Sequence, residues 1–243
     1  MLYKQPRSQC RHQNGPFSIV PNLPGYAIPG RHDHGYGPLA RFDDTTLEPG
    51  GFVPMHEHRN DEIITYITDG LVRHADSSGA RLVASPTKIM VMNAGKSFWH
   101  EEGTTPDDPT LRALQIFVRP HTVDLEPNIQ FKEIGTPPLN EWRLLAGPEN
   151  TEAPSFIRND VRLYDAHLVR GAEVALPKRQ GWDAFIHAYR GRIDVNETSL
   201  DTKESTLLVN ETEVRVRALE DAIVVAFLIN PKARVTHAGT IGH

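Results

Sequence analysis

The chain has 243 residues, enough for one large β domain or two domains of about 120 residues each. Its formal net charge of −5 argues against a polyanionic partner, since direct DNA binding needs a strongly basic patch. There is one cysteine, Cys10, and no apolar run approaches the roughly 20 residues that span a bilayer. The first residues also lack the apolar stretch of a signal peptide. We therefore expect a soluble cytoplasmic protein with no membrane or direct nucleic-acid partner.

Turn-forming residues divide the chain into short pieces, with 18 glycines and 19 prolines in all. No long stretch keeps the roughly 3.6-residue apolar period of a helix, whereas short segments rich in β-branched and aromatic residues recur. This pattern predicts an all-β sandwich or barrel with little helix. Residues 1–30 are rich in proline and basic at Lys4, Arg7 and Arg11. We expect them to form a covering segment, with an edge strand at 16–20.

His32 and His34 form an H-x-H pair within a glycine-rich stretch. They fit two interpretations, a further metal site or lid, and a loop with solvated or hydrogen-bonded histidines. No complementary His/Glu pair is near in the sequence, and glycines at this density indicate a loop. We favour the loop.

The first strong motif is His56-Glu57-His58, which follows a turn at Pro49-Gly50. In a β-strand, residues i and i+2 point to the same face about 7 Å apart, a span from which two imidazoles can reach one ion. The segment 63–67 then predicts a strand and Asp69-Gly70 a hairpin turn. On the return strand, His74 takes a polar position in the alternating pattern, and we expect it at the surface.

The second motif, His100-Glu101-Glu102, follows a strand at 88–92 and a turn at 93–95. Two adjacent strands with such pairs would form one pocket of four ligands, with Glu57 and Glu101 pointing the other way. Three imidazoles and one carboxylate suit Fe(II), Mn, Ni, Cu or Zn. Phe98 and Phe52, which share parity with the ligands, are candidates for an apolar wall. Gln115 and Phe117 are alternative candidates to line the pocket. The predicted ligands are His56, His58, His100 and Glu102.

Both motifs resemble those of a known family. G-x5-H-x-H-x3-E, from Gly50 to Glu62, resembles the first cupin motif, and N-A-G-x4-H-x-E, from Asn93 to Glu102, resembles the second motif as pirins have it. The resemblance implies two tandem cupin domains, each a jelly-roll β-barrel, of which the N-terminal one alone holds a metal. It places the four predicted ligands at the family's ligand positions. Glu62, a ligand in some cupins, would instead orient a histidine.

A shift in composition over 119–155 marks the connection between domains. We predict an N-terminal metal-binding cupin domain at 1–137 and a C-terminal metal-free cupin-like domain at 138–243. The second half repeats the pattern of the first, with Gly191 matching Gly70, but residues 177–180 replace the H-x-H pair and offer no ligand. Arg215 and Arg217 stand on the other ligand strand, and protonated arginines cannot bind a cation. His187 is expected to be packed or hydrogen-bonded, and the C-terminal tail to cross back over the first domain.

The pirin resemblance implies a quercetin 2,3-dioxygenase-like oxygenase acting on a small aromatic substrate of the flavonol type with O2. The cofactor would be one divalent metal ion, with Fe(II) the expected ion and Zn, Mn, Ni and Cu as alternatives. The non-ligating oxygen of Glu102 is the candidate catalytic base for a substrate hydroxyl. The alternative is a non-enzymatic, metal- or redox-responsive regulatory protein that binds a protein partner. A third hypothesis is a metal site that serves stability only.

Overall fold

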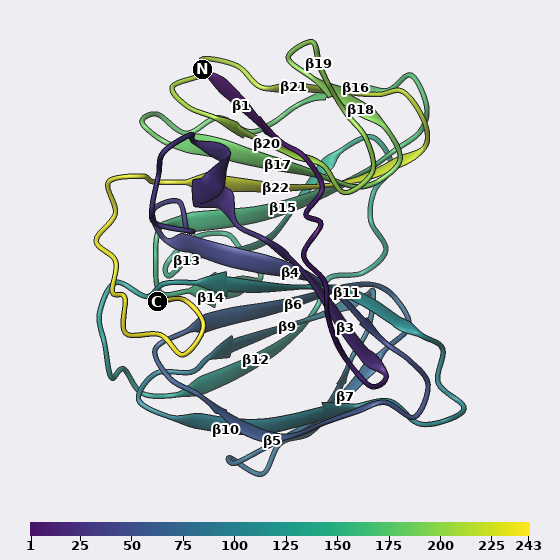
Figure 1. Ribbon diagram of the computed structural model, residues 1–243, viewed down its shortest axis with the longest axis vertical. Helices are drawn as coiled ribbons and strands as arrows, with labels where there is room; N and C mark the ends of the chain where they lie inside the picture. The colour runs from purple at the N-terminus through teal and green to yellow at the C-terminus, as the bar shows by residue number, and fades with distance from the viewer.

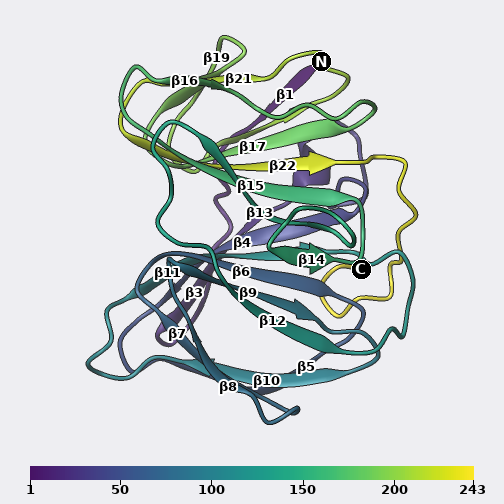
Figure 2. The same cartoon turned by 180° about the vertical axis from the view of Figure 1, so that it is seen from behind.

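The computed structural model describes residues 1–243 as two stacked β units, each made of one seven-stranded and one four-stranded sheet. The two large sheets face each other in the middle of the molecule, and the small sheets lie at its two ends (Figure 1; seen from behind in Figure 2). The single helical element is the short 3₁₀ turn η1 (Pro24–Ala27). None of the helical structure has the length and hydropathy that a membrane crossing requires. The expected all-β cupin-type fold with little helix is confirmed.

The N-terminal unit contains both metal-ligand motifs, on two neighbouring strands of its small sheet. Its large sheet has the strand order β12 (Asn128–Glu133), β9 (Lys88–Asn93), β6 (Glu62–Asp69), β11 (Leu111–Val118), β4 (Leu39–Leu47), β3 (Phe17–Asn22) and β2 (His12–Asn14). Its small sheet has the order β5 (Phe52–His58), β10 (Phe98–Gly103), β7 (Val72–Asp76) and β8 (Arg81–Ala84).

The C-terminal unit includes the first strand of the chain. Its large sheet has the order β1 (Leu2–Gln5), β20 (Ser205–Leu208), β17 (Asp183–Arg190), β22 (Ala222–Ile229), β15 (Val161–Leu168), β13 (Trp142–Pro148) and β14 (Ser155–Ile157). Its small sheet has the order β16 (Glu173–Ala175), β21 (Arg215–Ala218), β18 (Ile193–Val195) and β19 (Thr198–Leu200). Strand β1 pairs with β20 across the molecule and not with its neighbours in sequence, and the division into domains at 1–137 and 138–243 stays a prediction.

The hairpin glycines show that the two units repeat one plan. Gly70 lies between β6 and β7 with φ 78°, and Gly191 lies between β17 and β18 with φ 76°. A Cβ atom at Gly70 would lie 2.6 Å from the Thr110 carbonyl oxygen, and one at Gly191 would lie 2.3 Å from that of Asp221. Both positions need glycine for the left-handed backbone and for the close approach, which accounts for the match predicted from sequence.

The facing large sheets share one core of 23 buried residues. The Phe42 ring of the N-terminal unit lies 5.8 Å from Phe185 and 5.3 Å from Phe227 of the C-terminal unit, between ring centroids. Tyr66 donates a buried hydrogen bond of 2.9 Å to Asp165 across the same interface. Because the apolar surface of each large sheet is buried on the other, the two units are stabilised together.

The two small sheets enclose different interiors. In the C-terminal unit, a cluster of 18 buried apolar residues, including Val216 and Ala218 of β21, fills the space that corresponds to the predicted metal pocket. Arg215 and Arg217 alternate with them and point outward, where they pair with Glu173 and with Asp194. In the N-terminal unit, buried histidines occupy this space.

After β22 the tail crosses back over the N-terminal unit, as expected (yellow in Figure 1). The buried carboxylate of Asp61 accepts hydrogen bonds from the backbone N–H groups of Ile241 (3.0 Å) and Gly242 (2.9 Å). Arg119, which is 1% exposed, donates to the Gly242 carbonyl oxygen and forms a two-pronged ion pair with Asp33. These contacts anchor the tail beside the strand end that carries His58.

Candidate metal centre

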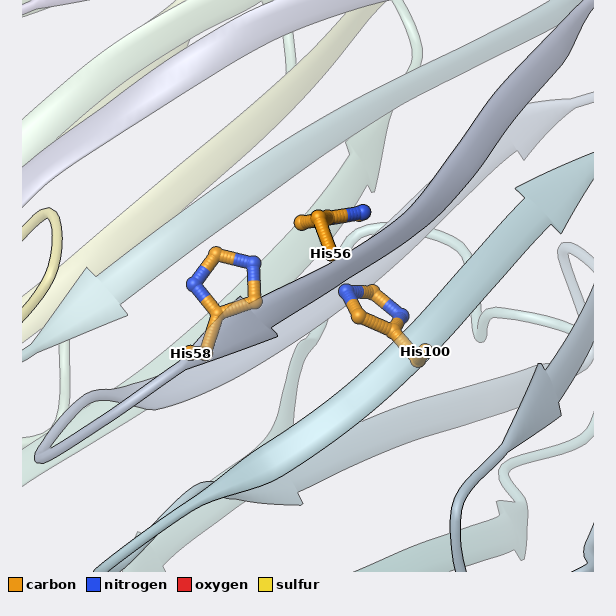
Figure 3. Close-up of side chains that lie close together, drawn as sticks. All are labelled: His56, His58 and His100. Carbon is orange, nitrogen blue, oxygen red and sulfur yellow. The ribbon is translucent and has the colours of Figure 1, made fainter.

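Three imidazoles meet inside the N-terminal unit. Strands β5 and β10 are antiparallel neighbours, with His56 directly opposite His100 and His58 opposite Phe98. Opposite residues of an antiparallel pair share a face, so His56, His58 and His100 point to the same side (Figure 3). Their ring centroids lie 4.4 to 5.2 Å apart, and one nitrogen of each ring lies within 4.8 Å of the others. The structure thus brings three of the four predicted ligands together.

Burial keeps two of these rings in the form that can bind a metal. His100 is fully buried, and this desolvation, with the neighbouring histidines, lowers its pKa to about 2. Desolvation also lowers the pKa of His56, whose Nδ1 lies 2.8 Å from the Pro54 carbonyl oxygen. A carbonyl only accepts, so Nδ1 of His56 carries the proton and Nε2 keeps its lone pair. Nδ1 of His58 is buried without a hydrogen-bond partner, as is Nε2 of His100.

His74 belongs to the same interior, and the expectation of a surface position was wrong. It is 2% exposed; its Nε2 lies 2.8 Å from Asp76 Oδ2 and its Nδ1 lies 3.4 Å from His100 Nδ1. The β7–β10 register sets Glu102 opposite His74 and His100 opposite Asp76, which turns Val72, His74 and Asp76 inward. The prediction assumed that the polar residues of this strand face the solvent, whereas the polar His74 and Asp76 face the interior. Asp76, two residues after His74, was the signal that could have corrected it.

This contact chain fixes the tautomers of both rings. Asp76 accepts from Nε2–H of His74, so Nδ1 of His74 has the lone pair and accepts from Nδ1–H of His100. Nε2 of His100 is then the atom with the free lone pair, and it is the nitrogen without a partner. A carboxylate behind a histidine is the usual way to orient a metal ligand, here extended by one further imidazole.

Glu102 lies with His74 and His100, whereas the group of His56, His58 and His100 does not include it. The register between β5 and β10 shifts between His100 and Glu102, so that Glu102 lies opposite Val53. Such a bulge re-aims the side chains that follow it. The carboxylate of Glu102 forms a second group with His74 and His100, whose ligand atoms lie within 4.8 Å of one another. His100 is common to both groups.

The carboxylate of Glu102 lacks any partner in the protein. Its Oε1 is buried and makes no hydrogen bond, and burial raises the pKa of the side chain to about 7. A buried, unpaired carboxylate is costly, and a cation beside it would remove the cost. The carboxylate of Glu102 and the free Nε2 of His100 are donors that suit a divalent metal.

Glu62 does not orient a histidine, contrary to expectation. It accepts hydrogen bonds from the Asn93 side chain and the Arg158 backbone N–H, and burial raises its pKa to about 7. The left-handed backbone at Asn60 (φ 51°) breaks the strand alternation after His58, so the parity of Glu62 does not follow from that of His58. Asp61 instead lies 3.7 Å from Nδ1 of His58.

The surroundings of the cluster are partly apolar. Phe98 is buried with its ring centroid 6.5 Å from that of His100, and Phe117 lies 6.2 Å from His58. Phe52 is 56% exposed and is no part of that wall; it borders a groove of about 390 Å³ on the small sheet. The groove also reaches Glu102, His74, Leu82, Arg73 and Arg81.

The other predicted H-x-H pair stays outside the cluster. His32 is exposed, and His34 packs edge-on against His243 with ring centroids 6.0 Å apart. The favoured loop interpretation of residues 31–35 agrees with their lack of regular structure.

Comparison with known families decides the affiliation of the chain. Residues 7–118 match the family model for pirin, and residues 144–228 match that for the quercetinase C-terminal cupin domain. The chain belongs to the pirin family. A quercetin 2,3-dioxygenase of Escherichia coli K12 is 22% identical to this pirin over 201 residues, which are 81% of this chain and 84% of the relative. A pirin-like protein of Caulobacter vibrioides is 27% identical over 192 residues, 78% of this chain and 82% of the relative.

Solved structures share the fold of the whole chain. The bacterial pirin YhhW from Escherichia coli in complex with nickel(II) has a TM-score of 0.82 at 20% identity, over 94% of this chain and 99% of that one. A quercetin 2,3-dioxygenase from Acinetobacter baumannii has a TM-score of 0.78 at 23% identity, over 95% of this chain and 86% of that one. This pirin is therefore a bicupin protein with a candidate divalent-metal site in its N-terminal unit.

Proposed function

We propose that this pirin binds one divalent metal ion through His56, His58, His100 and Glu102 and acts as a dioxygenase on a flavonol-type substrate. The observation that carries the proposal is the convergence of three imidazoles, two of them buried, near a carboxylate whose buried oxygen has no partner. The relatives named as quercetin 2,3-dioxygenases support the choice of reaction. Fe(II) is the ion we expect, since this donor set also suits O2-activating iron.

The chain supplies an ordered set of donors and a base. Asp76 and His74 hold His100 so that its Nε2 faces the cluster, and the Pro54 carbonyl oxygen holds His56. A divalent metal held by His56, His58, His100 and Glu102 would supply the chemistry that activates O2 and polarises a substrate oxygen. The second carboxylate oxygen of Glu102 is the candidate acceptor for the proton of a substrate hydroxyl.

The groove beside Glu102 offers a route for an aromatic substrate. Its volume of about 390 Å³ lies within the range of roughly 300–1,000 Å³ that is usual for small-molecule sites. Phe52, Leu82 and Val83 provide apolar surface, and Arg81 provides positive charge, whereas Arg73 is paired with Asp108. This combination suits a planar polyphenol with ionised hydroxyl groups.

Anaerobic reconstitution tests the proposal. Metal-free protein is loaded with Fe(II), metal content is measured, and quercetin and O2 are then added while carbon monoxide release is followed. We expect one ion per chain in wild type, loss of metal and turnover in His58→Ala, and neither loss in the control His32→Ala, which changes an exposed histidine outside the cluster. Full occupancy without turnover of any flavonol, with each first-row metal in turn, would overturn the dioxygenase assignment.

One observation favours a second candidate function, a metal-responsive regulator that binds a protein partner. Asp61 lies 3.7 Å from His58 and also holds the tail through Ile241 and Gly242. A change of oxidation state at the metal could therefore alter how firmly the tail is anchored. Hydrogen exchange at residues 239–243 in the Fe(II) and Fe(III) forms tests this; identical exchange in both forms would eliminate the tail as the responding element.

A further inference from the structure

A second hollow, which shares no lining residue with the metal centre, lies where the two units and the N-terminal segment meet. Its volume is about 430 Å³, similar to that of the groove beside Glu102. Its apolar lining is limited to Val20 and the ring of Tyr189, so it does not suit an aromatic substrate. We call this hollow the basic groove. Its charged lining residues are Arg7, Arg11, Asp44, Arg112, Arg190 and Lys203.

Three separate parts of the chain deliver the positive charges. Arg112 lies on β11 of the N-terminal unit, whereas Arg190 and Lys203 belong to the C-terminal unit. Arg7 and Arg11 lie between β1 and β2, on the segment that passes from the large sheet of one unit to that of the other (purple in Figure 1). A ligand in the basic groove would contact all three.

Two of the five cations are already neutralised. Lys203 donates to Asp44 at 3.1 Å, and its Nζ lies 3.3 Å from the centroid of the Tyr189 ring, a cation–π contact. Arg190 pairs with Asp69 at 2.8 Å. These contacts fix the floor of the groove and leave its positive charge to the remaining three side chains.

Arg7, Arg11 and Arg112 have no carboxylate within ion-pair distance. Arg11 donates one hydrogen bond, from Nε to the hydroxyl of Ser18 at 2.7 Å, and its terminal nitrogens stay free. Three uncompensated guanidinium groups around one hollow repel each other in a protein whose net charge is −5. An anion between them would relieve that repulsion.

Another groove of this molecule contains arginines that are paired with carboxylates. The open groove on the small sheet of the C-terminal unit, about 560 Å³, also contains arginines. There Arg215 pairs with Glu173 and Glu213, and Arg217 pairs with Asp194. Acidic partners thus compensate the arginines of that groove, whereas Arg7, Arg11 and Arg112 of the basic groove lack them.

We propose that the basic groove binds a small polyanion that carries two or more linked phosphate groups. Guanidinium groups bind phosphate through paired N–H donors. Three guanidinium groups without acidic partners match several linked phosphates better than a single phosphate. The hydroxyls of Ser18, Thr46 and Thr202 add donors suited to phosphate oxygens. The bound ligand would tie both units and the N-terminal segment together. The proposal involves none of the metal-centre residues, so it stands or falls independently of the oxygenase assignment.

Calorimetric titration with sodium tripolyphosphate tests the proposal, with pyrophosphate and inorganic phosphate as shorter probes. We expect one site per chain, affinity that increases with the number of phosphates and falls as salt is added, and a higher melting temperature in the complex. Arg112→Ala should weaken tripolyphosphate binding about tenfold or more, the factor expected for a hydrogen bond to a charged group. Arg112→Lys keeps the positive charge but lacks the paired N–H donors of the guanidinium group, so it should retain only part of the affinity for tripolyphosphate.

The control is Arg170→Ala, which removes one exposed positive charge outside the basic groove. Melting of each variant without ligand verifies that it is folded. Equal affinity of Arg112→Ala and Arg170→Ala would show that only overall charge matters and would overturn the site. Absence of tripolyphosphate binding at millimolar concentration would do the same. Single-stranded oligonucleotides that bind more tightly per phosphate than tripolyphosphate would replace the small ligand with a nucleic acid.

Discussion

Replacing Glu102 by glutamine should stabilise the metal-free protein and destabilise the metal-loaded protein. The carboxylate is buried beside His74 and His100, and its Oε1 has no hydrogen-bond partner. Burial raises its pKa from the ordinary 4.5 to about 7. Glutamine has nearly the same shape and carries no charge, so the substitution removes the cost of an ionised group and also removes a metal ligand.

The magnitude follows from the pKa. Because the folded state holds the Glu102 proton more tightly than the unfolded chain, this side chain costs nothing below pH 4.5. As pH rises from 4.5 to about 7 the free energy of unfolding falls, and above that the cost is constant. At about 1.36 kcal/mol per pH unit, the full cost is about 3 kcal/mol. The free energy of unfolding of metal-free Glu102→Gln should therefore exceed that of wild type by about 2–3 kcal/mol at pH 8 and by less than about 1 kcal/mol at pH 5.

Urea unfolding of chelator-treated protein at pH 5 and pH 8 measures this difference, and the same measurement with saturating Fe(II) under anaerobic conditions should reverse the order. Glu101→Gln is the matched control, since Glu101 is the adjacent residue and is excluded from both metal-ligand groups. The reasoning is refuted if metal-free Glu102→Gln is less stable than wild type at pH 8. That outcome would mean that the carboxylate has a favourable partner in the folded protein.

Two further substitutions test the tail and the shared core. Asp61→Ala removes the acceptor of two backbone N–H groups of the tail and should lower the free energy of unfolding by about 2–4 kcal/mol, with faster hydrogen exchange at 239–243. The control Asp107→Ala, at an exposed position, should change neither stability nor exchange. Unchanged exchange at 239–243 in Asp61→Ala would contradict the anchoring role. Phe42→Ala opens a cavity against Phe185 and Phe227 and should cost about 3–5 kcal/mol. Urea unfolding should still show one transition, because both units share this core; two separate transitions would disprove the coupling.

The sequence alone determined which strands carry the donors. Side-chain alternation and turn chemistry are local, so H-x-H and H-x-E next to turns predicted that His56, His58 and His100 would converge. The same local rules predicted the hairpin glycines at Gly70 and Gly191. Net charge, in contrast, is an average over the chain, and it concealed the basic groove that three distant segments assemble.

Only the tertiary structure decided what stands opposite each donor. The bulge between His100 and Glu102 turns the carboxylate toward His74, and the β7–β10 register turns His74 itself inward. The crossing of β1 to the sheet of the other unit likewise depends on a partner, β20, that lies about 200 residues away in sequence. Register and bulges are set by such long-range pairing and packing, which no local pattern of residues records.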